Sequence, residues 1–395
     1  MLRLSNLANM VKPSATLAAG AKAKEMKASG IKVYDFTLGE PDFPTPPHIR
    51  AAAQKAMDEG HTKYTAAEGL PALRQAVCKL YHERNGLTYT PDQVIISNGA
   101  KHSLHNALSA LVGPGDEVII PTPYWTSYND LVTMTGAASK FVNTTIDQGF
   151  KLTAAQLKAA ITPTTKLLMM NSPSNPTGVT YTREELLSLA NVIVEHKLAV
   201  LSDEIYENLT YDNVKTTCVA SLRPEMQDLS IIVSGGSKSF AMTGWRIGWA
   251  VGPRHVIKAM GNIQSQQTGC PNSISQYAAV IALNSDMKAL HEMRAEFQAR
   301  RDLICKGLAS LPGITVHQPT GAFYAFFNVS KHFGKTLHGI KIENSADFCR
   351  AALEKVQVSV VPGSAFGAEG YVRLSFAASR EDLQGGVEQL RKLLS

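Results

Sequence analysis

Lys238 is the residue whose surroundings in this sequence best suit covalent chemistry. It lies in the run SGGSKSFAMTGWRIG, which begins at Ser234 and directly follows the apolar residues Ile231-Ile232-Val233. Such a run predicts a buried strand, and open α/β sheets bind their ligands where strands end. A lysine held among small residues beside another cation, here Arg246, loses proton affinity, and its free amine can condense with a carbonyl to form a Schiff base. We therefore expect a reactive amine at this position.

The neighbours of Lys238 also suit a phosphate group. Gly235, Gly236 and Ser237 allow backbone and hydroxyl to approach an anion closely, and Arg246 is near enough to hold the anionic end of the same ligand. The pattern G-x-x-x-x-G-K-[ST] is absent, so the run is not a nucleotide P-loop. Without such neighbours, a lysine is ordinarily a solvated surface charge.

Three further segments place polar or aromatic residues after predicted strands. Asp203 follows the apolar run Leu198–Leu201, where a carboxylate is well placed under a ligand or, alternatively, caps a helix. A strand from Val94 to Ser97 leads through a glycine turn into a helix ending near Val112, and this join predicts an anion cradle at the helix N-terminus. Trp125 follows the strand predicted at 116–120. Its side chain either packs against the flat ring of a cofactor or covers the apolar core.

Together these motifs resemble the class I/II aminotransferases, which are pyridoxal phosphate (PLP) enzymes of fold type I, and in particular the bacterial-type aspartate aminotransferase branch. SKSFAMTGWRIG is similar to the cofactor-lysine motif of that family. The family's other motifs follow in its order: GEPDF at 39–43, NPTG at 175–178 and the strand-like GYVRLSF at 370–376. The resemblance covers the chain from Lys12 to Phe376 and implies PLP as cofactor, with an amino acid and a 2-oxo acid as substrates.

The resemblance assigns the catalytic work to three residues. Lys238 binds PLP and, once displaced, moves a proton between the substrate Cα and C4′ of the cofactor. Asp203 keeps the pyridine nitrogen protonated through a charge-assisted hydrogen bond. Tyr206 shares the 3′-oxygen of the cofactor with Asn175.

The remaining roles that the resemblance implies concern binding. Tyr64 reaches across a dimer interface to the phosphate, so a homodimer with shared sites is expected. Gly235 stands where some members have a phosphate-binding serine. Ser237 and backbone amides are therefore expected to provide more of the hydrogen bonds to the phosphate. The implied cofactor-binding set is Tyr64, Gly99, Ala100, Lys101, Trp125, Asn175, Asp203, Tyr206, Ser237, Lys238 and Arg246.

For the substrate, the resemblance places the backbone of Gly39 beside the α-carboxylate, which Arg373 holds by two parallel hydrogen bonds that a lysine cannot reproduce. The implied substrate-binding set is Lys12, Gly39, Lys101, Trp125, Asn175 and Arg373.

Substrate choice stays open between related activities. Residues 263–275 contain no arginine, whereas animal-type aspartate aminotransferases carry their side-chain carboxylate partner there. The bacterial-type branch uses a lysine at the position of Lys101, so aspartate with 2-oxoglutarate is our first expectation. Lys12 matches a residue linked to prephenate use, which makes a glutamate/aspartate-prephenate or aromatic aminotransferase an alternative.

A PLP-dependent carbon–sulfur β-lyase would need the same Lys238, Asp203 and Arg373. A PLP-binding regulator would need a DNA-binding domain, for which few residues precede the expected helix at Ser14.

Length and pattern predict the architecture. A chain of 395 residues exceeds the usual size of one core, so two domains are expected. We predict an α/β fold: residues 46–285 form a large PLP-binding domain with a mostly parallel central sheet flanked by helices. Residues 1–45 and 286–395 form a smaller α+β domain. One long helix from Ser273 to Leu311 leads into it, and its strands are expected at 314–317, 322–329, 358–361 and 371–376.

Composition excludes several other classes of protein. A net charge of +6, from 39 Lys+Arg and 33 Asp+Glu, lacks a basic stripe and gives no reason to expect a nucleic-acid partner. Five cysteines without a C-x-x-C pair indicate a reducing compartment and no metal site. No apolar run reaches the roughly 18 residues of a membrane span.

Residues 1–24 lack acids, as transit peptides do, but the family-like Lys12–Thr16 lies within them. We therefore expect a mature N-terminus and a cytoplasmic protein.

Overall fold

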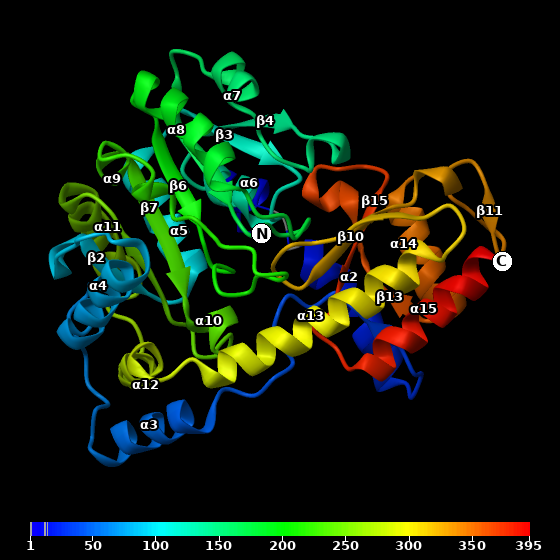
Figure 1. Cartoon of the computed structure of the whole chain (residues 1–395), viewed down its shortest axis with the longest axis horizontal. Helices are drawn as coiled ribbons and strands as arrows, with labels where there is room; N and C mark the ends of the chain where they lie inside the picture. Colours follow the sequence, from blue (N-terminus) through cyan, green and yellow to red (C-terminus); the bar gives the residue numbers. More distant parts are fainter. Residues whose placement is uncertain (1, 12, 14) are drawn as a thin grey trace.

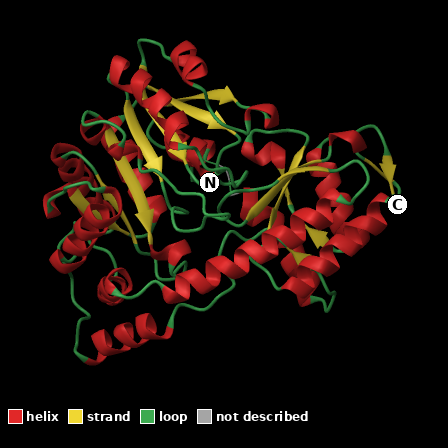
Figure 2. Ribbon diagram, in the orientation of Figure 1, coloured by secondary structure: helices red, strands yellow, loops and turns green. Residues whose placement is uncertain are grey.

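The computed structural model describes residues 2–11, 13 and 15–395, which fold around one seven-stranded and one four-stranded sheet, with two further sheets of two strands each. Figure 1 shows the larger sheet on one side of the molecule and the smaller on the other, with both joined by the long helix α13 (Lys288–Ala309). Figure 2 shows helices covering both sheets. The architecture is α/β, as the sequence predicts.

The larger sheet has seven strands within the described residues, and its strand order brings distant segments together. All neighbouring strands are parallel except β8, which is antiparallel to both of its neighbours. In spatial order the strands are β2 (Val94–Ser97), β8 (Gly248–Val251), β7 (Ser230–Gly235), β6 (Ala199–Asp203), β5 (Thr165–Asn171), β3 (Glu117–Thr122) and β4 (Ala138–Asn143).

Strand register places three strand ends side by side. Asn171, the last residue of β5, pairs with Asp203, the last residue of β6, and Asp203 pairs with Val233 of β7. Because parallel strands end at the same edge of a sheet, the segments that follow these strands meet there. The short helix α10 (Gly236–Ser239), which carries Lys238, follows β7 directly.

Alternation along the strands explains why this sheet is buried on both faces. Ile119 and Leu168 point to one apolar core, whereas Val118 and Leu167 point to another on the opposite face. The first core is completed by α4 (Pro71–Asn85), α7 (Ala154–Ala160), α8 (Arg183–His196) and α9 (Met226–Leu229). The second is completed by α5 (Ala100–Leu111), α6 (Ser127–Thr133) and α11 (Arg254–Gln267).

The smaller sheet is antiparallel throughout and carries its own apolar core. Its strands, in spatial order, are β14 (Val361–Pro362), β15 (Tyr371–Ser375), β10 (Tyr324–Asn328) and β9 (Thr315–His317). Helices α13, α14 (Ser345–Val356) and α15 (Arg380–Leu394) contribute to this core.

The N-terminal segment joins the smaller-sheet region, and other short elements complete the described fold. Phe36 is buried in the core of that region, and β1 (Tyr34–Asp35) pairs in parallel with β13 (Val358–Ser359). The other short elements are α1 (Asn6–Met10), α2 (Ala15–Ala28), α3 (Pro47–Asp58), α10 (Gly236–Ser239), α12 (Ser273–Asn284), β11 (Thr336–Leu337), β12 (Ile340–Lys341) and 3₁₀ turns at 91–93, 146–148, 219–221, 330–332 and 363–366.

Two predicted elements are wrong in extent. The single helix predicted from Ser273 to Leu311 is two helices, α12 and α13, because Ser285 is extended and the Asp286 carboxylate accepts a hydrogen bond from the backbone of Lys288. Short polar side chains of this kind compete with helical backbone bonds. The strand predicted at 358–361 is divided into β13 and β14, which pair with different partners. Ser14, the expected cap of the first helix, lies outside the described residues.

Within the described ranges, no helix combines the length and apolar character needed to cross a membrane. All five cysteines lie in the described part of the chain and are free. No cluster of three or more potential metal ligands occurs among the residues that the structure describes.

Candidate active site

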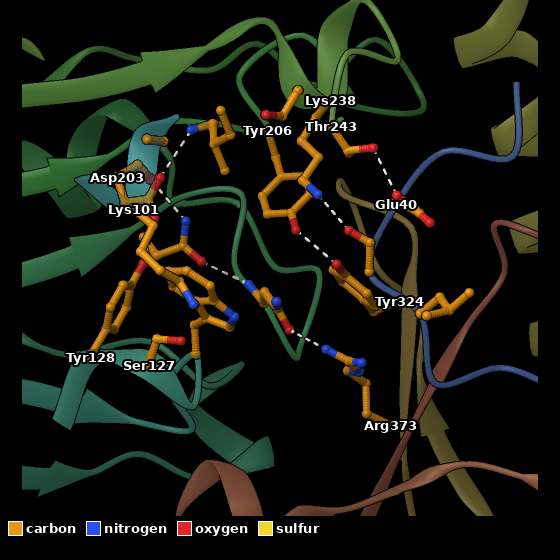
Figure 3. A pocket seen from close by; sticks show the side chains of 18 of the residues that line it. Glu40, Lys101, Ser127, Tyr128, Asp203, Tyr206, Lys238, Thr243, Tyr324 and Arg373 are labelled. Atoms are coloured by element: carbon orange, nitrogen blue, oxygen red, sulfur yellow. Dashed lines mark hydrogen bonds between the residues drawn. The ribbon is translucent and has the colours of Figure 1, made fainter. Parts of the chain in front are cut away.

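A pocket of about 410 Å³ opens between the two sheets, and it gathers residues from segments far apart in the sequence. Figure 3 shows these side chains pointing toward a common space. Its lining residues are Leu38, Gly39, Glu40, Ala100, Lys101, Trp125, Ser127, Tyr128, Asn171, Asn175, Asp203, Ile205, Tyr206, Ser237, Lys238, Thr243, Arg246, Tyr324 and Arg373.

Lys238 enters the pocket from α10, the single helical turn that follows β7. Its ammonium donates a hydrogen bond to the carbonyl of Gly39, which belongs to the loop after β1. Burial lowers the pKa of Lys238 to about 8, although the charges of Glu40 and Asp203 oppose this shift. Near neutral pH a larger fraction of this amine is therefore unprotonated, and so able to accept a proton, than in an exposed lysine.

Asp203 lies at the end of β6 and is only 3% exposed. The Tyr128 hydroxyl donates to its Oδ2 at 2.8 Å, and the backbone N–H of Ile205 donates to its Oδ1 at 3.2 Å. Burial raises the pKa of Asp203 to about 6, and these hydrogen bonds oppose the rise. No helix begins here, since residues 205–208 form a turn, so the alternative role of helix cap does not apply.

Arg373 is a buried cation on β15 that faces the pocket and is 1% exposed. Its Nη1 donates to Oδ1 of Asn175 at 3.0 Å, and its Nη2 donates to the carbonyl of Thr37 at 2.7 Å. Its Nε is buried without a hydrogen-bond partner among the described residues. Because its described partners are neutral, the guanidinium retains an uncompensated charge that suits an anionic ligand.

One end of the pocket is a cradle of backbone and glycine. Helix α5 begins at Ala100 after Gly99, whose φ of 85° favours glycine. A β-carbon on Gly99 would lie 2.5 Å from Nη2 of Arg246, and one on Gly248 would lie 2.3 Å from the backbone N of Ala100. The absence of side chains thus lets the arginine and the helix N-terminus converge, an arrangement that attracts anions.

Lys101 and Trp125 form one wall of the pocket. The lysine Nζ lies 4.8 Å from the tryptophan ring centroid, and burial, followed by the charge of Arg246, lowers the pKa of Lys101. Trp125 also packs edge-on against Tyr128 and against the core around α5. It therefore covers core and also faces the pocket, where its contact with a flat ring stays a prediction.

Comparison with known proteins now gives the family. A profile described as aminotransferase class I and II matches residues 31–390. The chain belongs to this family. It is 46% identical to an aspartate aminotransferase of Geobacillus stearothermophilus over 100% of this chain and 99% of the relative. It is 47% identical to an aspartate/prephenate aminotransferase of Cereibacter sphaeroides over 97% of this chain and 96% of the relative.

Solved structures agree with this assignment. The aspartate aminotransferase of Rhizobium meliloti has a TM-score of 0.97 and 42% identity, with 100% of this chain and 99% of that chain covered. The Thermus thermophilus aspartate aminotransferase with maleate has a TM-score of 0.94 and 40% identity over 100% of both chains. The fold of this aminotransferase is accordingly PLP fold type I, which confirms the fold expected from the sequence.

Aminotransferases of this family depend on PLP and act on amino acids and oxo acids. The pocket fits that cofactor chemically. It offers a glycine cradle beside Arg246 at one end, the buried carboxylate of Asp203 at another side, and the amine of Lys238 within reach of both. PLP carries the matching groups, namely a phosphate, a ring nitrogen and an aldehyde.

The structure brings most of the predicted aminotransferase site residues into one pocket. Gly99 contributes backbone next to Arg246 instead of lining the space. Tyr64 is 95% exposed and does not line the pocket of its own chain. Lys12 lies outside the described residues.

Sequence reasoning did not assign several lining residues to the site. Asn171 offered a signal, because it ends an apolar strand as Asp203 does, and its Nδ2 donates to the Asp203 carbonyl at 2.8 Å. Several others, such as Glu40 and Thr243, lie inside motifs that the sequence had already linked to a ligand, but no feature of their own assigned them to the pocket. The unassigned residues are Leu38, Glu40, Ser127, Tyr128, Asn171, Ile205, Thr243 and Tyr324.

Proposed function

We propose that this aminotransferase transfers the amino group of aspartate to 2-oxoglutarate. The observation that carries the proposal is the buried guanidinium of Arg373, whose described hydrogen-bond partners are neutral, in the same pocket as the amine of Lys238 and a further cation, Lys101. A dicarboxylic amino acid has one carboxylate for each of these cations and one amine for the reaction. The names of the Geobacillus and Rhizobium relatives support this choice of substrate.

PLP supplies an aldehyde for covalent attachment of the amine and a ring that takes up electrons when the substrate Cα loses its proton. The side chains of the protein hold PLP and the substrate in place and move protons between them. Lys238 is proposed to carry the proton from Cα, a task that suits an amine whose pKa is about 8. Its hydrogen bond to Gly39 fixes the amine on the side of the pocket formed by the loop after β1.

Asp203 is proposed to hold the proton of the ring nitrogen. A carboxylate does so best when it is ionised and shielded from water. Tyr128 stabilises the ionised form by donating a hydrogen bond to Oδ2. Tyr206 and Asn175 are proposed to donate to the ring oxygen on the opposite edge. Both side chains line the pocket and are nearly fully buried.

Arg373 is proposed to bind the α-carboxylate of the substrate. Its two hydrogen bonds, to Asn175 and to the Thr37 carbonyl, fix the plane of the guanidinium before the ligand arrives. A planar fork of this kind can hold a carboxylate by two parallel bonds. The backbone of Gly39 lies on the same wall.

The phosphate of PLP is proposed to bind Arg246, Ser237 and the N-terminus of α5 at residues 99–101. Tyr64 is proposed to complete this site in the neighbouring subunit of a homodimer. Its 95% exposure on a single chain supports that role, because a large aromatic residue so exposed is typical of an interface.

Prephenate is the second candidate acceptor. The relative from Cereibacter sphaeroides, at 47% identity, is named an aspartate/prephenate aminotransferase, and so is one from Nitrosomonas europaea at 42%. The residue that suggested prephenate from the sequence, Lys12, is outside the described part of the chain.

Steady-state kinetics with a panel of donors and acceptors tests the proposal. We expect the highest kcat/KM for aspartate with 2-oxoglutarate, and measurable transfer from aspartate or glutamate to prephenate if the second activity exists. A preference for aromatic donors, or release of pyruvate and ammonia from a cysteine conjugate without transamination, would contradict the first choice.

We also propose the division of the chain and its compartment. Residues 46–285 are the cofactor-binding domain, and residues 1–45 with 286–395 form the smaller one, since Phe36 and the elements from α13 onward share a core. The free state of all five cysteines supports work in a reducing compartment, and we propose the cytoplasm. Limited proteolysis and cell fractionation test these two statements.

A further inference from the structure

Tyr324 lies in β10, where the two sides of the pocket meet. Its hydroxyl is 2.7 Å from the hydroxyl of Tyr206, and both side chains are buried. Its ring lies under Arg373, whose Cζ is 4.6 Å from the ring centroid. Figure 3 shows the Tyr206 and Tyr324 hydroxyls meeting, with Arg373 nearby. One side chain therefore touches both the proposed donor to the cofactor ring and the proposed holder of the substrate carboxylate.

The loop after β1, which contains Gly39, packs closely against the Tyr324 hydroxyl. A β-carbon on Gly39 would lie 2.8 Å from the Tyr324 oxygen, so any larger residue there would push the hydroxyl away. The carbonyl of the same Gly39 accepts the hydrogen bond from Lys238. The hydroxyl pair is thus enclosed by groups that the proposed reaction uses.

The direction of the hydroxyl pair follows from the charges around it. Burial raises the pKa of both phenols, and Arg373 opposes the rise at both, most directly at Tyr324, where its charge is the largest contribution after burial. At Tyr206, burial raises the pKa well above its ordinary range, and the charge of Asp203 adds to the rise. The two oxygens are close enough for either hydroxyl to donate, and because the more acidic phenol is the better donor, the charges favour donation from Tyr324 to the oxygen of Tyr206. The single proton of Tyr206 is then free to point into the pocket.

We propose that Tyr324 is a positioning residue that couples the carboxylate site at Arg373 to the donor strength of Tyr206. The inference rests on the proposed function, in which Tyr206 donates to the ring oxygen of PLP. A hydrogen bond received by Tyr206 polarises its own O–H, because linked hydrogen bonds strengthen one another. A carboxylate on Arg373 reduces the positive charge over the Tyr324 ring and so changes the bond that Tyr324 gives.

Tyr324→Phe in the PLP-loaded enzyme tests the coupling. Without the hydroxyl, Tyr206 is a weaker donor, so more negative charge stays on the ring oxygen and protonation of the bound chromophore is favoured. We expect the apparent pKa of its visible absorbance to rise by about half a unit, which corresponds to the net value of one neutral hydrogen bond. We expect maleate, a dicarboxylate without an amine, to shift this titration in the wild-type enzyme, and we expect the variant to show about half of that shift or less.

Two comparisons separate coupling from general damage. Tyr211→Phe removes another fully buried hydroxyl, which donates to the Ala322 carbonyl beside β10 and does not line the pocket. We expect its titration to match the wild-type enzyme. In a Tyr206→Phe background, Tyr324→Phe should no longer shift the titration, since the residue through which it acts is gone.

Each outcome decides one of the two hypotheses. An unchanged titration and unchanged maleate response in Tyr324→Phe overturn the inference, and so does an equal shift in the Tyr206→Phe background or in Tyr211→Phe. If the wild-type protein gives no titratable visible band with PLP, the proposed function fails instead. A shift confined to Tyr324→Phe with intact Tyr206 supports the coupling.

Discussion

Single residues in the pocket are made reactive by burial without full compensation. Lys238 and Asp203 both have pKa values shifted toward neutrality by loss of water, to about 8 and about 6. Arg373 keeps its charge with neutral described partners, because two hydrogen bonds orient it and neither partner is an anion. Such groups destabilise the empty fold and are stabilised when ligands of opposite charge bind.

Lys101 allows a direct test of substrate choice. Lys101→Ala should lower kcat/KM for aspartate by about tenfold to a hundredfold, because it removes the charge-assisted hydrogen bond that we propose to the side-chain carboxylate. The loss for phenylalanine should be much smaller, since that donor has no such carboxylate. Kinetics with both donors measure the difference. Lys258→Ala, an exposed change on α11, is the control, and equal losses for both donors in Lys101→Ala would remove the residue from side-chain recognition.

The residues that sequence reasoning identified carry a local pattern, whereas the missed ones depend on contacts between distant segments. Lys238 and Asp203 each follow an apolar strand, so their place at the sheet edge could be predicted. Tyr324 meets Tyr206 across 118 positions, and Glu40 accepts a hydrogen bond from Thr243 across 203 positions. Nothing in the residues adjacent to either member indicates its partner.

At the scale of elements, parallel register does most of the positioning. The paired ends of β5 and β6 fix Asn171 beside Asp203, and β7 delivers the next loop to the same edge. Apolar runs made these strands predictable. The antiparallel direction of β8 was not predictable from its composition, because a strand buried on both faces reads the same in either direction.

Packing of β8 against α5 predicts the effect of one added methyl group. Gly248→Ala would place a β-carbon 2.3 Å from the backbone N of Ala100, so the start of α5 must move. We expect PLP to bind about tenfold more weakly, since overpacking of this size costs on the order of 1–3 kcal/mol. Fluorescence titration of the apoenzyme measures this change. Gly244→Ala, which has no atom within 4 Å of the added carbon, should bind PLP normally.

The residue after β6 carries a second buried carboxyl group. Glu204 accepts hydrogen bonds from Ser202 at 3.0 Å and from the backbone of Val219 at 3.3 Å. Burial, with a further contribution from Glu207, raises the pKa of Glu204 to about 8. The carboxyl is therefore protonated in the folded chain at neutral pH but ionised in the unfolded chain.

This difference gives a pH dependence with a defined sign. Between the ordinary pKa of 4.5 and about 8, only the folded state holds the proton, so stability falls as pH rises. Relative to Glu204→Gln, which has no proton to lose, the wild-type enzyme should lose roughly 1.4 kcal/mol per pH unit across this window. Urea unfolding at several pH values between 5 and 8 measures the difference. A constant difference across the window would contradict the raised pKa.

At the scale of the whole molecule, the pocket is lined by residues of both larger sheets and of the segments that connect them. The loop after β1 reaches over the edge of the large sheet, where Gly39 meets Lys238 and Thr45 donates to the Ala241 carbonyl at 2.6 Å. Asp42 of the same loop forms an ion pair with Arg300 of α13 at 2.7 Å. This loop therefore ties the substrate side of the pocket to both halves of the chain.

The proposed sharing of the site between two subunits can be tested with hybrid dimers. Lys238→Ala subunits should be inactive because they lack the reactive amine, and Tyr64→Ala subunits should be weak because each depends on the tyrosine of its partner. A hybrid dimer of the two variants contains one site with both Lys238 and Tyr64 intact. Because one of the two sites of each hybrid is intact, the purified hybrid should show about half of the wild-type activity per dimer. Co-expression with two affinity tags, followed by assay of the doubly purified hybrid, measures it. Activity no higher than the mean of the two parent variants would mean that Tyr64 serves only its own chain, or none.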